Sequence, residues 1–350
     1  MAPSFSLSRA FMRRRQTAHR QRGFTLVELL VSILIAGGIV SGLLYLVNEL
    51  LRADKSESTR DETQRELQLA LDFMANEIQQ AVYIYTDATS LPPIIPNDPP
   101  RSMLEYLPAA DLPNEVAPVL AFWKQQRFPE SVIELCATDP TNVILTGTTC
   151  EAGHSYSLVV YSLARPDDNE VWDGPARIIR SAMTEFDLDD ATGTPNRNPD
   201  YVNPVDPDDG RADFDGWPLT GTIPGFNQPA DTLVDFVDDG SGAESAGFAR
   251  GSGASACPTN SVVVGVQDVR NYLVSPSNPL TFGAEPVRSF YACIDEPPIS
   301  PAAWNQEVII YLQGNASGRS GAVSQNSFLP ALETTVLSRG ILGKNPQSFQ

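Results

Sequence analysis

The residues with the clearest chemistry lie near the start of the chain, where a single carboxylate, Glu28, precedes a long apolar segment. From Leu29 to Val47 the sequence has 19 consecutive uncharged residues, about the length that a helix needs to cross the hydrocarbon core of a bilayer. A carboxylate at the centre of a membrane costs about 2.5–3.5 kcal/mol. Glu28 therefore either reaches the membrane–water interface or pairs with a cation that offsets this cost.

A basic segment precedes this carboxylate and ends at Gly23. It contains six arginines and no acidic residue: Arg9, Arg13, Arg14, Arg15, Arg20 and Arg22. By the positive-inside rule, we expect residues 1–23 to stay cytoplasmic and the rest of the chain to face outward. A secretory signal peptide would instead be cut after its apolar segment, and Ala36-Gly37-Gly38 offers a rival site of this kind. The apolar segment continues to Val47, which favours a retained membrane span.

Together these features resemble the N-terminal signal of type IV prepilins and type II secretion pseudopilins. The sequence Gly23-Phe24-Thr25-Leu26-Val27-Glu28 has the glycine of that signal, a following apolar residue and a glutamate five residues beyond the glycine. The resemblance implies that a prepilin peptidase cuts after Gly23 and that the new N-terminal amine, on Phe24, is methylated. It also implies that Glu28 pairs with the N-terminal amine of a neighbouring subunit when the helix enters a filament.

The helical pattern continues beyond the apolar segment, because neither proline nor glycine occurs between Leu43 and Tyr85. Apolar residues recur there at three- and four-residue steps, at Leu67, Leu71, Met74, Ile78 and Val82. Such spacing is typical of a helix with one buried face, and Glu66, Asp72, Glu77 and Gln80 are predicted to lie off that face. The sequence thus predicts one helix from about Phe24 to Tyr85, with residues 24–50 in a membrane or filament core and residues 51–94 as its amphipathic continuation.

Two glycines within the apolar segment, Gly38 and Gly42, form a small-xxx-small pair. This pair allows close packing of helices in a membrane, although glycine is also common in membrane helices that make no such contact. Many pilins have a proline in this part of the helix, and its absence here predicts a straighter helix or a minor subunit.

The remainder, residues 95–350, is predicted to form a β-rich head with long loops. The fold class is therefore α+β, with a long transmembrane and amphipathic N-terminal helix packed on a pilin-like head. An insertion at about residues 188–260 is rich in Asp, Gly, Pro and Asn and predicts a surface excursion. The candidate strands, which are β-branched or alternating and bounded by turn residues, are Val119–Trp123, Tyr156–Leu163, Ala176–Met183, Val262–Val266, Val287–Ala292, Glu307–Leu312 and Glu333–Leu337.

All four cysteines fall in the predicted head, at Cys136, Cys150, Cys257 and Cys293. An even number in an exported segment favours disulfides over free thiols. Three pairings are possible, and proximity in the sequence favours Cys136–Cys150 and Cys257–Cys293. The absence of a CxxC spacing, together with only two histidines, argues against a zinc site.

Within the insertion, carboxylates surround a glycine turn, and the candidate ligands among them are Asp206, Asp208, Asp213 and Asp215. Alternating carboxylates suit an oxygen-ligated calcium ion, and some pseudopilins bind calcium in loops of the head. The spacing departs from the EF-hand pattern, however, and no glutamate closes the loop at its twelfth position. An acidic, solvated loop is therefore the favoured interpretation, and calcium as a cofactor is the alternative. The turn from Asp235 to Gly240 has the same two interpretations.

The sequence lacks the G-x-S-x-G, Walker A and H-E-x-x-H signatures of common enzymes. His154, the only histidine outside the leader, is predicted to lie in a loop near a disulfide, so we expect a non-enzymatic protein. Loss of the leader would take the net charge from −19 to −25, since the leader holds six arginines and no acid. Such an acidic surface argues against nucleic acid as a partner and suits a periplasmic face.

Two further segments, Leu69 to Tyr85 and Pro118 to Lys124, are similar to the larger minor pseudopilins of the J or PilW type, and especially to the hormogonium polysaccharide secretion pseudopilins of filamentous cyanobacteria. Glu28 argues against the K-type tip subunit, which typically lacks that acid. The resemblance implies a single-pass inner-membrane precursor with a cytoplasmic N-terminus and a periplasmic head. It also implies assembly with other pilins or pseudopilins, driven indirectly by an inner-membrane platform and ATPase.

The role implied by this similarity is support of exopolysaccharide secretion by a periplasmic filament. Two alternatives remain open at the level of sequence. One is a minor subunit of a type IV pilus for adhesion, motility or DNA uptake, and the other is a membrane-anchored periplasmic enzyme or binding protein.

Overall fold

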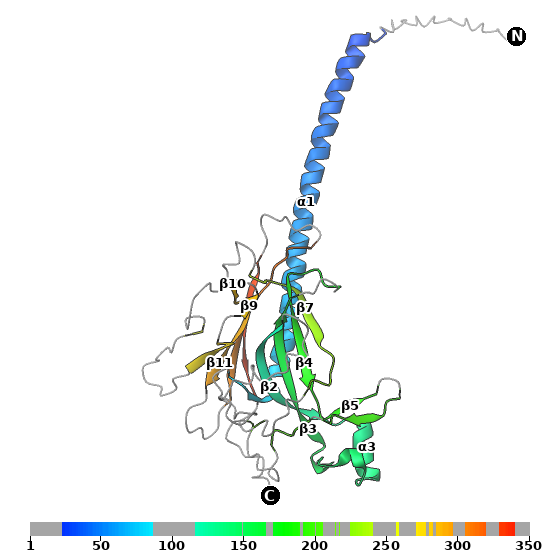
Figure 1. The fold of residues 1–350 in the computed structure, drawn as a ribbon. Helices are drawn as coiled ribbons and strands as arrows, with labels where there is room; N and C mark the ends of the chain where they lie inside the picture. The colour runs from blue at the N-terminus through cyan, green and yellow to red at the C-terminus, as the bar shows by residue number, and fades with distance from the viewer. Residues whose placement is uncertain are drawn as a thin grey trace, which may run out of the picture. The chain divides into compact units, whose positions relative to one another are not determined.

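The computed structural model describes residues 23–86, 116–148, 150–165, 171–189, 192–199, 201–205, 214, 217, 225–240, 257–258, 271–277, 280–282, 285–296, 305–319 and 329–339. The chain divides into two compact units, residues 1–54 and 55–350, and the division falls within helix α1 (Leu26–Ile78). In the first unit, every described residue of α1 is exposed. In the second unit, which we call the head, the rest of α1 packs against β-sheets (Figure 1). The predicted α+β class is confirmed.

The part of α1 in the head buries one face. Leu67, Leu71, Met74 and Ile78 are at most 4 % exposed, as their spacing predicts. Thr59 and Thr63 extend the buried face toward the N-terminus. The Thr63 hydroxyl is satisfied within the helix, because its Oγ1 donates to the Thr59 carbonyl at 2.9 Å.

Helix α1 ends at Ile78, so the prediction that it continues to Tyr85 is wrong. After a turn at Gln79 and Gln80, residues Ala81–Ile84 form strand β1 instead. Valine, tyrosine and isoleucine favour strands, and a distant side chain completes the pairing. The Ile84 N–H donates to Gln306 Oε1 at 2.9 Å, and Gln306 Nε2 donates to the Ile84 carbonyl at 3.0 Å.

Two antiparallel sheets form the body of the head. The larger has the order β1-β2-β3-β4-β7, with β2 at Val116–Arg127, β3 at His154–Ala164, β4 at Ala176–Met183 and β7 at Asp231–Val237. The smaller has the order β13-β12-β11-β8, with β8 at Asn271–Ser275, β11 at Phe290–Glu296, β12 at Glu307–Gln313 and β13 at Ala331–Leu337. Short pieces complete the described fold: α3 (Glu130–Thr138), η1 (Val143–Leu145), η2 (Cys150–Ala152), and the hairpins of β5 (Phe186–Leu188) with β6 (Pro195–Arg197) and of β9 (Leu280–Phe282) with β10 (Glu285–Val287).

The predicted strands largely match these elements. Those near residues 119, 156, 176, 307 and 333 lie in β2, β3, β4, β12 and β13, and the one expected from Val287 to Ala292 begins three residues later, as β11. The candidate Val262–Val266 lies outside the described residues. Several of the described strands, among them β1, β7 and β8, were not predicted. β7 lies inside the acidic insertion and joins the larger sheet, so the insertion is not only a surface excursion.

A single core joins α1 to both sheets. Met74 and Ile78 of the helix pack with Phe122 and Ile178 of the larger sheet and with Ile310 of the smaller one. On the opposite face of the larger sheet, a second cluster surrounds the fully buried Trp123 and includes Trp217 and Tyr201 from the insertion. The insertion thus contributes buried aromatic side chains as well as a strand.

Candidate functional site: the start of α1 and its attachment to the head

The first turn of α1 is capped by Thr25. The backbone N–H of Glu28 donates to Thr25 Oγ1 at 3.3 Å, and the N–H of Leu29 donates to the Thr25 carbonyl at 3.2 Å. Thr25 therefore occupies the N-cap and Glu28 the third helical position, which is the spacing of a Ser/Thr-x-x-Glu capping box. This Thr-x-x-Glu pattern is visible in the sequence. The sequence analysis nevertheless predicted a role only for Glu28 and none for Thr25.

Glu28 and Phe24 are both exposed in this chain, and Phe24 keeps 78 % of its surface. Among the residues that the structure describes, no cation forms an ion pair with Glu28. A carboxylate in the first turn gains about 0.3–1 kcal/mol from the helix dipole, which is less than the cost of about 2.5–3.5 kcal/mol at a membrane centre. The helix alone therefore does not offset burial of this charge in lipid or in a filament core.

The apolar part of α1 has the length and composition of a membrane span, and none of its apolar window is buried within the chain. Around Gly38 and Gly42, a Cβ placed on either residue would meet no atom within 4 Å. The described part of the chain thus makes no close packing at these glycines, and this role stays a prediction.

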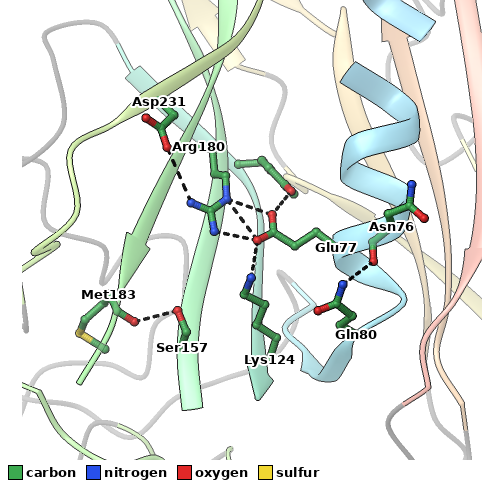
Figure 2. A network of polar contacts seen from close by, with 9 residues as sticks. Asn76, Glu77, Gln80, Lys124, Ser157, Arg180, Met183 and Asp231 are labelled. Carbon is green, nitrogen blue, oxygen red and sulfur yellow. Dashed lines mark hydrogen bonds and ion pairs between the residues drawn. The ribbon is translucent and has the colours of Figure 1, made fainter. Parts of the chain in front are cut away.

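At its other end, α1 is attached to the larger sheet through Glu77 (Figure 2). This carboxylate, 6 % exposed, accepts hydrogen bonds from Arg180 Nη2 at 2.7 Å and from Lys124 Nζ at 2.7 Å. It also accepts one from the Tyr161 hydroxyl. The three donors come from β2, β3 and β4, so one helical side chain joins three neighbouring strands. The prediction that Glu77 lies off the buried face of the helix is wrong.

The electrostatics of this cluster favour an ionised Glu77. Burial by itself would raise the pKa of Glu77, but the hydrogen bonds from Arg180, Lys124 and Tyr161 outweigh it and lower the pKa from 4.5 to about 2. Burial and the adjacent carboxylate raise the pKa of Tyr161, so that its hydroxyl stays protonated and donates. A cluster in which every charge is paired holds a structure together, but none of its groups is poised for proton transfer near neutral pH. The cluster is therefore an anchor between α1 and the larger sheet.

The cysteines form the two disulfides that proximity in the sequence favoured. Cys136 of α3 is bonded to Cys150 of η2, and Cys257 is bonded to Cys293 of β11. The Cα–Cα distances are 5.7 and 5.6 Å, within the usual range for disulfides. The first disulfide joins α3 to η2. The second attaches the end of the insertion to the smaller sheet.

The predicted acidic sites have different outcomes. Asp206, Asp208, Asp213 and Asp215 lie outside the described residues. The second acidic turn is not a solvated loop, because Asp238 and Asp239 are buried. Asp238 accepts from Asn315 Nδ2 at 2.9 Å, and Asp239 pairs with Arg165 at 2.9 Å. Within the described part of the chain, no group of three or more metal-ligating side chains is arranged to hold an ion.

Comparison with known proteins gives one match, to the N-terminal segment. Residues 18–44 match the family model of the prokaryotic N-terminal methylation motif. No curated protein and no solved structure matches the chain. The matched residues include Gly23, Phe24 and Glu28, and they support a type IV pilin-like subunit that is processed by prepilin peptidase and anchored by a single helix.

Proposed function

We propose that this chain is a non-enzymatic minor pseudopilin, a precursor in the inner membrane that joins a periplasmic filament after processing. The leader, residues 1–23, stays cytoplasmic; the peptidase cuts after Gly23, and the amine of Phe24 is methylated. The observation that carries the proposal is the methylation motif at residues 18–44. The motif coincides with the start of an apolar helix. The first 26 residues of that helix, Leu26 to Leu51, are all exposed.

Glu28 supplies the assembly step. Its cost in an apolar environment exceeds the helix-dipole gain by about 2 kcal/mol, and a cation from outside the chain is needed to offset the difference. After processing, the N-terminal amine of a neighbouring subunit is such a cation. The pair forms only when two helices are in the correct axial register, and this would select the position of the subunit in the filament.

The filament's task is proposed to be support of exopolysaccharide secretion. The support for this narrower role is the similarity of the segments Leu69 to Tyr85 and Pro118 to Lys124 to polysaccharide secretion pseudopilins. In the structure these segments are the end of α1, strand β1 and the middle of β2, and they carry Glu77 and Lys124 of the anchor. The head's acidic surface suits a periplasmic location.

The first test is the intact N-terminal mass of the full chain, extracted from membranes with and without a prepilin peptidase. We expect a chain that begins at methylated Phe24 only when the peptidase is present. A chain that still begins near Met1, or one that is cut after Ala36, would refute the filament proposal.

A second test separates processing from assembly. Glu28→Ala should be cut normally yet fail to enter filaments, whereas Glu49→Ala, a matched change farther along the same exposed helix, should be cut and incorporated. Normal incorporation of Glu28→Ala would remove the pairing role. In a deletion strain, loss of secreted polysaccharide with normal twitching supports the pseudopilin, and loss of twitching with normal polysaccharide identifies a type IV pilus subunit instead.

A further inference from the structure

A groove of about 440 Å³ lies on the head, between α1 and the edge of β7. One wall is formed by Glu66 and Leu69 of the helix, the other by residues 232–236 of β7, and Trp172 and Arg319 complete the lining. All of these residues belong to the head, and none belongs to the N-terminal motif or to the Glu77 anchor.

The groove follows the main chain of β7 along its outer edge. Side chains of a strand alternate between its two faces, whereas five consecutive residues of β7 line this groove. The alternation is interrupted in β7 by two register shifts against β4, on either side of Val234, and the run shows that the groove follows this strand along its length. β7 is the last strand of the larger sheet, and in the described part of the chain its outer side is paired only at its end, where Val237 bridges to Gly314 and the Asn315 N–H donates to the Phe236 carbonyl.

The groove also exposes large apolar side chains. Trp172 keeps 43 % of its surface and Leu69 keeps 59 %. Phe236 has a φ of 60°, a backbone conformation that an aromatic residue rarely adopts. Its ring is held by the Arg319 guanidinium, which lies 4.1 Å from the ring centroid. Trp172 and Leu69 thus present apolar surface to the groove beside a residue in a sparsely populated backbone conformation.

The charge of the groove favours a basic occupant. Among the residues that the structure describes, Glu62, Glu66 and Asp235 lie in or beside it, and the one cation in the lining, Arg319, already pairs with Glu62 at 3.2 Å and with Glu66. Acid is therefore in excess. A second copy of this chain is a poor occupant, since the chain has a net charge of −19 and would bring like charge to the site.

We propose that the groove binds an extended, basic segment of a partner protein, which adds as a strand to β7 and places an apolar side chain between Trp172 and Leu69. Main-chain hydrogen bonds at the strand edge would supply affinity, and the apolar contact and acidic rim would supply specificity. The inference does not depend on the proposed function, because it uses only residues of the head.

The test uses the full chain in detergent and three synthetic hexapeptides as probes. One is basic and alternating, Lys-Val-Arg-Leu-Lys-Val; the second has glutamate in place of each cation; the third is the basic peptide with N-methylated amides at alternate positions. Binding is measured by calorimetry at low and at physiological salt. We expect the basic peptide to bind and the other two to bind at least about tenfold more weakly.

Variants of the head then locate the site. Trp172→Ala and Leu69→Gln should each weaken binding of the basic peptide by at least about fivefold. Phe73→Gln is the matched control, because Phe73 is also an exposed apolar residue of α1, 48 % exposed, but does not line the groove; it should change binding less than about twofold. No binding of the basic peptide, equal binding of the N-methylated peptide, or equal loss with Phe73→Gln would each overturn the proposal.

Discussion

Glu77→Gln should destabilise the head by about 3 kcal/mol, because it removes the one charge that the anchor shares among three strands. Lowering the pKa of Glu77 from 4.5 to about 2 corresponds to about 3 kcal/mol in favour of the ionised form. Breaking a buried ion pair by removing one partner typically costs about 3–5 kcal/mol. Arg180 and Lys124 each keep 16 % of their side-chain surface, so water can partly solvate the cations left behind, and the lower figure is expected.

The assay is urea unfolding of the full chain in detergent, followed by tryptophan fluorescence. All four tryptophans lie beyond residue 120, in the head, so the signal reports unfolding of the head and not of the apolar helix. Glu62→Gln is the matched control: it also removes a carboxylate of α1 from an ion pair, but Glu62 is 62 % exposed, and such pairs contribute about 0.2–1 kcal/mol. Equal losses for the two variants, or a loss below about 1 kcal/mol for Glu77→Gln, would refute the anchor.

The same variant gives a pH dependence with a definite sign. A carboxylate whose pKa is depressed in the folded state contributes its full stability above its unfolded pKa and loses it as the pH falls toward the folded pKa. The native head should therefore lose about 3 kcal/mol between pH 4.5 and pH 2 through Glu77, and the difference between native and Glu77→Gln proteins should shrink over that interval. A difference that stays constant across the interval would contradict the assignment.

Two further changes test how the sheets are joined. Gln306→Ala should cost about 2 kcal/mol in the same unfolding assay, because it leaves the buried N–H and carbonyl of Ile84 without their partner; stability within about 0.5 kcal/mol of the native protein would show that another group replaces it. Gly314→Ala should cost about 1–3 kcal/mol, since its Cβ would lie 2.3 Å from Leu67 Cδ1 and 3.2 Å from Pro330 Cγ. A loss below about 0.5 kcal/mol would contradict the close approach at Gly314.

Local patterns in the sequence predicted several parts of the structure. The apolar stripe of α1 at Leu67, Leu71, Met74 and Ile78 follows from helical periodicity, and it is buried as expected. The disulfides join cysteines 14 and 36 residues apart, and these short loops are the ones that chain entropy favours. The motif from Gly23 to Glu28 could be recognised without a structure because all of its parts lie within six consecutive residues.

Tertiary structure decided the rest, because the partners are distant in the chain. The sequence predicted that Glu77 lies off the buried face of the helix. In the fold, Arg180, 103 residues away, lies within hydrogen-bond distance of it. Ile84 of β1 is hydrogen-bonded to the side chain of Gln306, 222 residues away, and no local pattern encodes that pairing. β7 lies in a segment whose composition predicted a loop, and its place at the edge of the larger sheet is what creates the groove beside α1. Periodicity shows which face of an element is apolar, but the partner of a buried charge or of a strand edge is set only when the chain folds.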